Sequence, residues 1–201
     1  GVLARKYGTP IYATQGTIEA IRNTACVGKI PQELFHPVCA DEKLIIKDLV
    51  CNPLSISHDA AQPVAYRISH GKKKVGIVTD LGNYNDYTVE SLKGMNALVL
   101  EANHDVNMLQ VGPYPYYLKQ RILGDKGHLS NERAGQLLCR LLHPQLQMVV
   151  LGHLSKDNNL PELAYETVRV EVTMSMDSAG TGDIPLQVAR RSEVSEVVHI
   201  A

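Results

Sequence analysis

The chain has 201 residues, of which 44% are hydrophobic and 20% charged, a composition typical of a folded globular domain and not of a disordered chain. Twenty basic and twenty-one acidic residues give a net charge of −1, which excludes attachment to nucleic acid through bulk charge. No apolar run approaches the ~18 residues that a membrane-spanning helix requires.

Short apolar runs alternate with helical patterns along the whole chain, which predicts an α/β protein. In the first part, the pattern predicts a helix that ends at Gly8, a strand at 11–14, and a helix after Gly16 with Thr17 as its N-cap. Residues 44–56 are rich in β-branched side chains and predict an extended segment with a break near Pro53. Residues 64–68 and 75–79 flank a polar turn and predict a hairpin.

In the second part, residues 97–100 and 147–151 predict short buried strands. Between them, residues 133–142 carry an apolar stripe at i, i+3, i+4, i+7 and i+8, which predicts a helix. A helix at 161–167, an extended segment at 168–174 and a loop at 177–183 follow. No repeat or linker interrupts the chain, so we expect one domain over residues 1–201. The four cysteines lack CxxC spacing, which predicts reduced thiols in a cytoplasmic protein.

Four of the apolar runs end in a polar or ionisable group. These groups are His58, Asp80, Glu101 and His153. Side chains at the carboxyl ends of neighbouring strands converge on one edge of a sheet, where sites form. Histidine and aspartate in this arrangement suit zinc, manganese or iron. Each histidine alone is more often a hydrogen-bonded surface or core residue than a ligand, and Asp80 could serve only a turn. The repetition at several strand ends strengthens the case for a shared site, and the spacing alone goes no further.

Six short segments occur in an order that identifies a family. They are Ser57-His58-Asp59-Ala60, Thr79-Asp80-Leu81-Gly82, Leu100-Glu101-Ala102-Asn103-His104-Asp105, Gly112-Pro113-Tyr114-Pro115, Gly127-His128-Leu129-Ser130-Asn131 and Leu151-Gly152-His153-Leu154-Ser155. With these segments the chain resembles the YycJ/WalJ group of metallo-β-lactamase-fold hydrolases over nearly its whole length. The resemblance implies an αββα sandwich.

The resemblance also implies a two-metal phosphodiesterase that uses zinc or manganese and acts on DNA as a 5′-to-3′ exonuclease. It assigns His58, Asp80 and His153 as metal ligands, with Asp80 bridging the two ions. Glu101 and His128 resemble the Glu–His pair of the ribonuclease Z enzymes, which transfers a proton to the leaving group. Two metal ions held close together lower the pKa of a bound water toward ~7, so that hydroxide can attack the phosphorus.

One segment of the family pattern is missing from this sequence. The His-x-His-x-Asp-His motif, which supplies most of the ligands in this fold, would stand just before residue 1. We therefore expect the chain to be the C-terminal portion of a longer parent, to lack part of the first β-sheet, and to leave an apolar sheet face uncovered. On this expectation, the activity belongs to the parent, and activity of the present chain itself is doubtful.

Aromatic and cationic side chains alternate in the segment between Glu101 and His128. Tyr114, Tyr116, Lys119 and Arg121 could stack on bases and hold phosphates, which predicts a DNA contact. An amphipathic helix whose tyrosines are half in the core explains the same pattern equally well. Asn103 and His104 are further candidates for contact with the substrate, with structural hydrogen bonding as their alternative role.

Two other functions stay open for this sequence. A hydrolase of small phosphodiesters or thioesters on the same fold would need a closed pocket and no Tyr/Lys surface. A chain that had lost its metal site would act by binding alone. No membrane partner is expected, and the sequence gives no oligomeric state.

Overall fold

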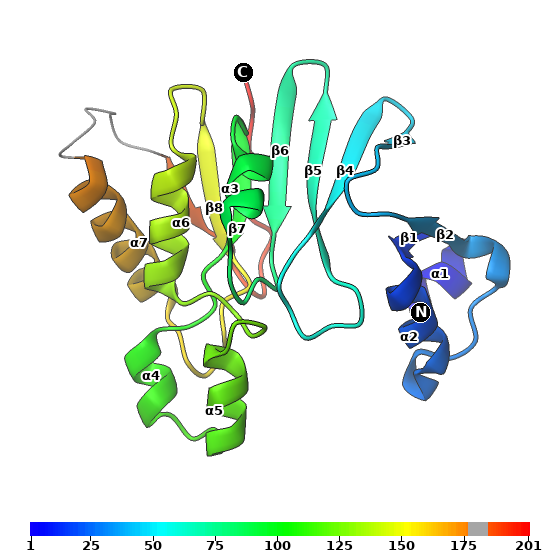
Figure 1. Cartoon of the computed structure of the whole chain (residues 1–201), viewed down its shortest axis with the longest axis horizontal. Coiled ribbons are helices and arrows are strands. Elements are labelled where there is room, and N and C mark those ends of the chain that lie inside the picture. Colours follow the sequence, from blue (N-terminus) through cyan, green and yellow to red (C-terminus); the bar gives the residue numbers. More distant parts are fainter. Residues whose placement is uncertain (177–184) are drawn as a thin grey trace.

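The computed structural model describes residues 1–176 and 185–201, and its largest element is a seven-stranded mixed sheet (Figure 1). The strands lie in chain order: β3 (Leu44–Ile46), β4 (Leu49–Ser55), β5 (Val64–His70), β6 (Lys73–Val78), β7 (Ala97–Glu101), β8 (Met148–Gly152) and β9 (Leu186–Val188). Neighbours from β3 to β6 are antiparallel, and those from β6 to β9 are parallel. The carboxyl ends of β6, β7 and β8 therefore share one edge, the lower edge in Figure 1.

Three helices cover one face of this sheet, as Figure 1 shows: α3 (Asp86–Leu92), α6 (Asn131–Leu141) and α7 (Pro161–Met176). The apolar stripe predicted at 133–142 is the buried side of α6, where Leu137 and Leu138 are at most 1% exposed. They pack against sheet residues such as Leu98, Leu100 and Val149 in one large core. The apolar side of α6 that the i, i+3, i+4 pattern predicted therefore packs against the sheet.

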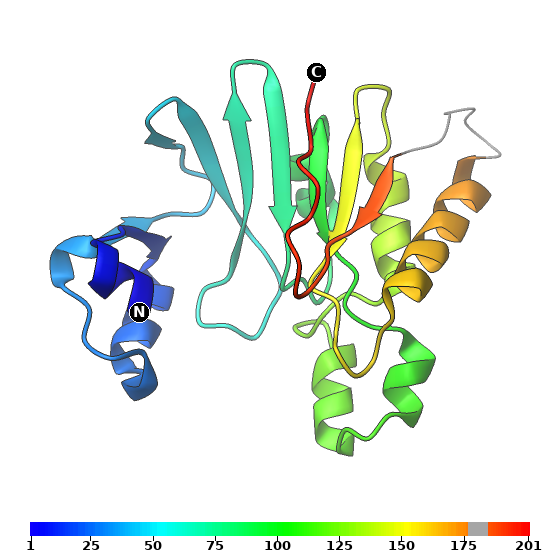
Figure 2. The ribbon, with the colours of Figure 1, turned by 180° about the vertical axis from the view of Figure 1, so that it is seen from behind.

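The opposite face of the sheet is less covered. Ile77, Val99 and Val150 lie side by side on it, and Ile77 keeps 37% of its surface exposed. In the reverse view of Figure 2, the residues after β9 cross this face. The expectation that an apolar sheet face is left uncovered holds only in part, because the segment after β9 crosses this face while Ile77 stays partly exposed.

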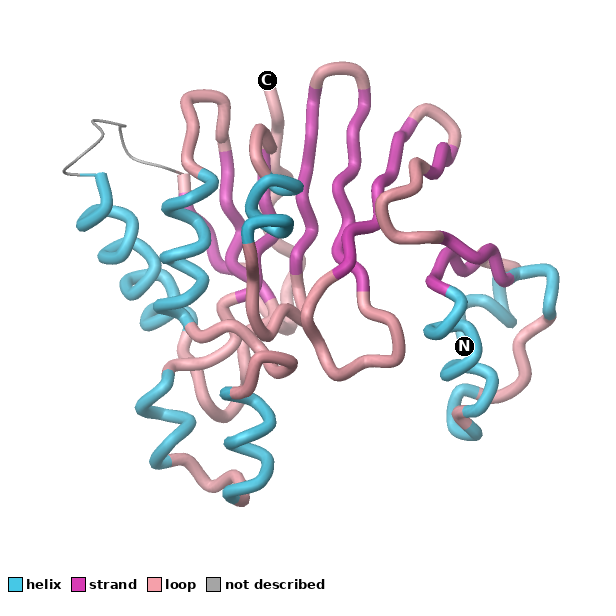
Figure 3. Tube along the Cα trace, in the orientation of Figure 1, coloured by secondary structure: helices cyan, strands magenta, loops and turns pink. Residues whose placement is uncertain are grey.

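A smaller unit precedes the large sheet and lies beside it (Figures 1 and 3). Its elements are α1 (Val2–Tyr7), β1 (Ile11–Thr14), α2 (Gln15–Asn23), two 3₁₀ turns (Ala25–Val27 and Gln32–Leu34) and β2 (Phe35–Val38). β1 and β2 pair in parallel over a small core of their own. Gln62 holds this unit to the sheet, because its carbonyl accepts from the Thr14 hydroxyl and its side chain accepts from the Gly16 amide. The single domain over 1–201 stays a prediction.

A helical hairpin stands at the lower edge of the sheet in Figure 3. It consists of α4 (Val106–Val111) and α5 (Tyr116–Leu123), which follow the end of β7. Asp105 caps α4 by accepting from the Met108 amide. The hairpin therefore lies next to the strand ends from which the polar groups emerge.

The predicted extended segment at 168–174 is wrong, because α7 continues as a helix to Met176. Ala164, Val168 and Val172 are buried at a spacing of four residues, a helical period that outweighs the β-branched composition. The loop predicted at 177–183 lies outside the described residues.

Two local predictions in the first part also fail. Thr14, not Thr17, precedes α2, and β4 runs through Pro53 without a break. Proline is tolerated there because β3 pairs only with Leu49–Cys51, which leaves β4 as an edge strand at Pro53. Among the described residues, no helix is long and apolar enough to cross a membrane.

Gly135 lets α6 approach α7 closely, which gives a test of the packing. A Cβ at this position would lie 2.6 Å from Cβ of Glu171 and 3.4 Å from Cα of Val168. Alanine raises helix propensity by ~1 kcal/mol, but overpacking costs about 1–3 kcal/mol. We therefore expect Gly135→Ala to lower the free energy of unfolding in urea titrations. Gln136→Ala, at an exposed neighbouring position, should change it by less than about 0.5 kcal/mol. A stabilised Gly135→Ala variant would contradict the packing described.

Candidate metal centre

The polar groups at the strand ends come together around Asp80. Nε2 of His58 and Nε2 of His153 each lie 3.6 Å from Oδ1 of Asp80. His58 follows β4, Asp80 follows β6 and His153 follows β8, so elements far apart in the sequence deliver the three donor atoms. The convergence predicted for these residues is therefore observed.

Two of the three residues have an unusual backbone. Asp80 and His153 both have φ of 58°, in the left-handed region that non-glycine residues seldom occupy. His153 directly follows β8, and Asp80 is the second residue after β6. Strain of this kind, of order 1–3 kcal/mol per residue, persists only where the surrounding structure imposes it and concentrates at functional sites.

His58 and His153 are each spaced from Asp80 as two ligands of one divalent cation would be. The three donor atoms are not all within 4.8 Å of one another. Among the described residues, the sets that are that compact are His58, Asp80 and His128, and Glu101, His128 and His153. In a tetrahedral site with bonds of about 2.1 Å, ligand atoms are about 3.4 Å apart. The two distances of 3.6 Å to Asp80 are close to that spacing. Two imidazole nitrogens and a carboxylate are also the ligand types that zinc and its neighbours prefer.

Glu101, the last residue of β7, lies beneath this centre with 0% of its surface exposed. Its Oε1 is 2.7 Å from Nδ1 of His128 and 2.8 Å from Nδ1 of His153. Its Oε2 accepts a hydrogen bond of 2.6 Å from the amide of Leu81, the residue after Asp80. One carboxylate thus holds both histidines and the turn that carries Asp80.

These contacts set the charge and the tautomers. Burial favours a raised pKa for the Glu101 carboxyl, but hydrogen bonds from His128, His153 and Leu81 outweigh it and lower the pKa below its ordinary value. An ionised carboxylate only accepts hydrogen bonds, so Nδ1 of each histidine carries the proton. Nε2 of His153 is then free to bind a metal, the usual carboxylate–histidine–metal arrangement. The bond to Glu101 also raises the pKa of His153, against the opposing effect of burial.

His128 stands between the other two histidines. Its ring centroid is 5.1 Å from that of His58 and 5.2 Å from that of His153. Its amide donates to the carbonyl of Ile122, and a Cβ on the preceding Gly127 would lie 2.1 Å from the same oxygen. The loop therefore holds the His128 ring against Glu101, as the predicted Glu–His pair requires.

Asn103 links the loop after β7 to the loop after β8. The Asn103 side chain donates to the carbonyl of His153, and the Ser155 amide donates to the carbonyl of Asn103. Asn103, expected to contact substrate, thus holds the strained His153 in place, although it also lines the pocket beside His128. His104, the other candidate, lies in the interior at 1% exposure, where a direct substrate contact does not fit. Burial lowers the pKa of His104 to about 4.

The residues expected to hold DNA lie on or beside α5, and several have partners within the protein. Lys119 Nζ donates to the carbonyl of Gln110, and Arg121 forms an ion pair with Asp59. The Tyr114 hydroxyl donates to Asp157. Tyr116, by contrast, is 76% exposed. The structure therefore gives the two cations a role in tying the hairpin down, and leaves the aromatic surface open.

Sequence reasoning missed two features of the site. The bond between Glu101 and His153 was not expected, because Glu101 was assigned to His128 alone. The link from Arg121 to Asp59, next to His58, was also missed. The acidic residue directly after His58 was the available signal, but its partner is 62 residues away along the chain.

The chain was compared with known proteins. Residues 2–153 match the model of the family described as "Beta-lactamase superfamily domain". The chain is 37% identical over 182 residues to exodeoxyribonuclease YycJ of Bacillus anthracis, covering 90% of this chain and 67% of that protein. It is 39% identical over 168 residues to exodeoxyribonuclease WalJ of Streptococcus pneumoniae, covering 84% and 62%. The chain thus spans about two thirds of the length of these relatives.

Solved structures show the same fold. Zn²⁺-bound PqqB of Methylobacterium extorquens matches with a TM-score of 0.64 at 15% identity, over 98% of this chain and 68% of that one. The metallo-β-lactamase-fold protein YhfI of Bacillus subtilis matches with a TM-score of 0.58 at 16% identity, over 90% and 62%. The predicted metallo-β-lactamase-like fold is confirmed. From the family match and from the identity to YycJ and WalJ, the chain belongs to the β-lactamase superfamily, in the YycJ/WalJ group.

Proposed function

We propose that the protein is a metal-dependent phosphodiesterase that degrades DNA as an exonuclease, in the 5′-to-3′ direction and in the cytoplasm. The observation that carries the proposal is the convergence of His58, Asp80 and His153 above the buried Glu101. The names of the two relatives, both exodeoxyribonucleases, support DNA as the substrate. All four cysteines are free thiols, which supports the proposed location in the cytoplasm.

His58, Asp80 and His153 would hold divalent ions, zinc or manganese. We propose two ions in a protein that also carries the His-x-His-x-Asp-His motif, because three ligands are fewer than two ions require. When bound, such ions supply a water of lowered pKa and stabilise negative charge on the phosphate. The contribution of the chain itself is orientation. Glu101 fixes the ring of His153, and its bond to the Leu81 amide fixes the turn at Asp80.

His128 is the proposed proton donor to the leaving oxygen. Its Nδ1 is held by Glu101, so its Nε2 can carry and release a proton toward the substrate. The ionised Glu101 accepts the hydrogen bond from Nδ1 of His128 and so orients the ring for donation. This division of labour gives the two histidines on one carboxylate different roles: His153 binds metal, and His128 transfers the proton.

The outer end of α5 is the proposed surface for DNA bases. Tyr116 and Tyr117 are 76% and 75% exposed on the hairpin next to the metal centre. Stacking on aromatic faces is worth ~1–3 kcal/mol per base and needs no particular sequence. Lys119 and Arg121 hold the platform to α4 and to Asp59.

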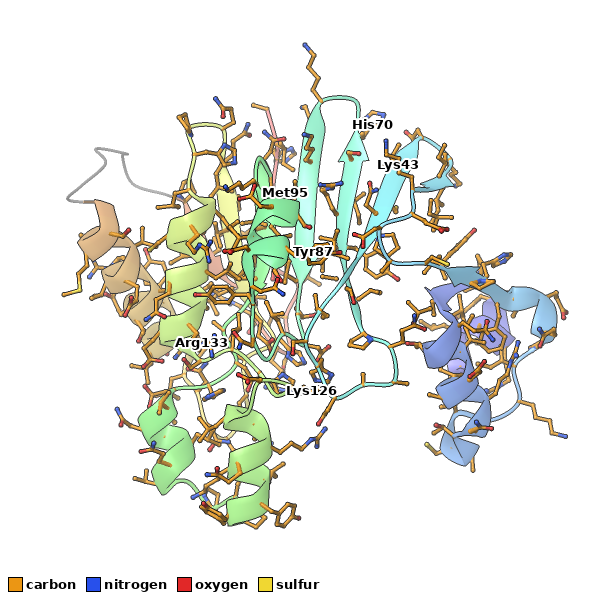
Figure 4. The ribbon with its side chains drawn as sticks, in the orientation of Figure 1. Lys43, His70, Tyr87, Met95, Lys126 and Arg133 are labelled. Carbon is orange, nitrogen blue, oxygen red and sulfur yellow. The ribbon has the colours of Figure 1, made fainter. Side chains whose placement is uncertain are left out.

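Metal binding tests the proposed ligands. His58→Ala, Asp80→Ala and His153→Ala should each lower the metal content of the purified protein, measured by elemental analysis after dialysis. His70→Ala, at an exposed position on the β5–β6 hairpin (Figure 4), should leave the metal content unchanged. Full occupancy in all three ligand variants would refute the assignment.

A comparison of two substrates with different leaving groups tests the role of His128. His128→Ala should reduce turnover of DNA by about 10²–10⁴-fold, the usual effect of losing a general acid. The loss should be much smaller on bis(4-nitrophenyl) phosphate, because nitrophenolate departs without a proton. Metal content should stay near that of the wild type. Equal losses on both substrates, or loss of metal, would show that His128 is a ligand or a structural residue.

A further inference from the structure

A pocket of about 690 Å³ opens beside the metal centre, on the side of His128 and His153. Its volume lies within the ~300–1,000 Å³ of pockets that take small molecules or single nucleotides. The loop after β8, the start of α7 and the segment after β9 enclose it. Polar lining residues include Asn103, Tyr114, Ser155, Lys156, Arg190 and Arg191.

The charge of this pocket is one-sided. Three of its lining residues are cationic (Lys156, Arg190 and Arg191), and none is acidic. Arg190 is paired with Glu193, whereas no hydrogen bond or ion pair joins Lys156 to another described residue. The adjoining pocket on the far side of Arg190 differs, because Glu162, Glu166 and Glu193 line it. Lys156 and Arg191 therefore lie in the pocket that His128 and His153 also line, although Arg190 and Arg191 border the acidic pocket as well.

The segments that position the metal centre also position these cations. Arg191 donates from Nη2 to the carbonyl of Leu154, the residue after His153. The Ala189 amide donates to the carbonyl of Leu151, which extends the pairing of β9 with β8. Lys156 follows in the loop whose Ser155 amide is bonded to Asn103. The pairing of β9 with β8 and the loop after β8 thus place Lys156 and Arg191 beside His153.

We propose that this pocket binds a second phosphate of the substrate, the one next to the scissile phosphodiester on the leaving-group side. The inference rests on the proposed function, because His128, the proposed proton donor, lines the pocket and so marks the leaving-group side. Lys156 and Arg191 contact the phosphate oxygens, and Arg191 keeps donors beyond the one used on Leu154. Ile122, Leu154 and Leu160 offer apolar surface for the sugar and base.

Binding of DNA at different salt concentrations tests the proposal without any need for turnover. Each phosphate contact that is lost should reduce the slope of log K against log[salt] by about 0.7 on single strands. We expect this reduction for Lys156→Ala with a fluorescein-labelled 12-mer, measured by anisotropy in EDTA. Lys156→Arg should retain the slope of the wild type. Lys72→Ala removes the same charge from the remote β5–β6 turn and should change nothing.

Activity on two substrates separates this inference from the proposed function. Lys156→Ala should raise KM for the 12-mer about tenfold and leave hydrolysis of bis(4-nitrophenyl) phosphate unchanged, because that ester has no second phosphate. A wild-type protein that hydrolyses neither substrate contradicts the proposed function, while the salt slopes still decide the pocket. If Lys156→Ala and Lys72→Ala have the same slope, or if the wild type does not bind the 12-mer, the pocket is not a phosphate site.

Discussion

The candidate site depends on one buried carboxylate. A charge with no exposure to solvent, as at Glu101, is costly unless hydrogen bonds compensate for it. Three donors do so, and they come from the ends of β6 and β8 and from the loop before α6. The need to satisfy Glu101 therefore fixes the relative positions of the segments that carry Asp80, His128 and His153. Removing one donor would leave the carboxylate undercompensated, at a cost of about 1–3 kcal/mol or more.

The hydrophobic core makes this arrangement rigid. Glu101 ends β7, which lies between β6 and β8 in parallel register, and the preceding Leu100 is fully buried. The strained backbones of Asp80 and His153 can persist because neighbouring bonds, from Leu81 to Glu101 and from Asn103 to His153, hold them. A rigid strand on each side keeps the donor atoms within the tolerance that a metal site demands.

Much of this centre could be predicted from the sequence, because strand ends in parallel sheets converge whatever the details of packing. The apolar runs before His58, Asp80 and His153 pointed to a shared edge, but the assignment of these residues as metal ligands came from the resemblance to the YycJ/WalJ group. The partner of Glu101 could not be predicted in full: its bond to His153 depends on β7 lying directly beside β8, and strand order is a property of the whole fold. The prediction of an extended segment at 168–174 was wrong for a related reason. Only the packing of α7 against α6 makes Val168 and Val172 part of a helical stripe. The ion pair between Arg121 and Asp59 likewise joins a helix to a distant loop.

The protonation of the two histidines tests the role of Glu101 most directly. Long-range ¹H–¹⁵N spectra of the histidine side chains, recorded near pH 8, distinguish a proton on Nδ1 from one on Nε2. With Glu101 ionised and accepting from both rings, His128 and His153 should each carry the proton on Nδ1, and Glu101→Ala should remove that preference in both. Neutral rings with the proton on Nε2 alone in the wild type would contradict the account, because Nδ1 could not then donate to Glu101.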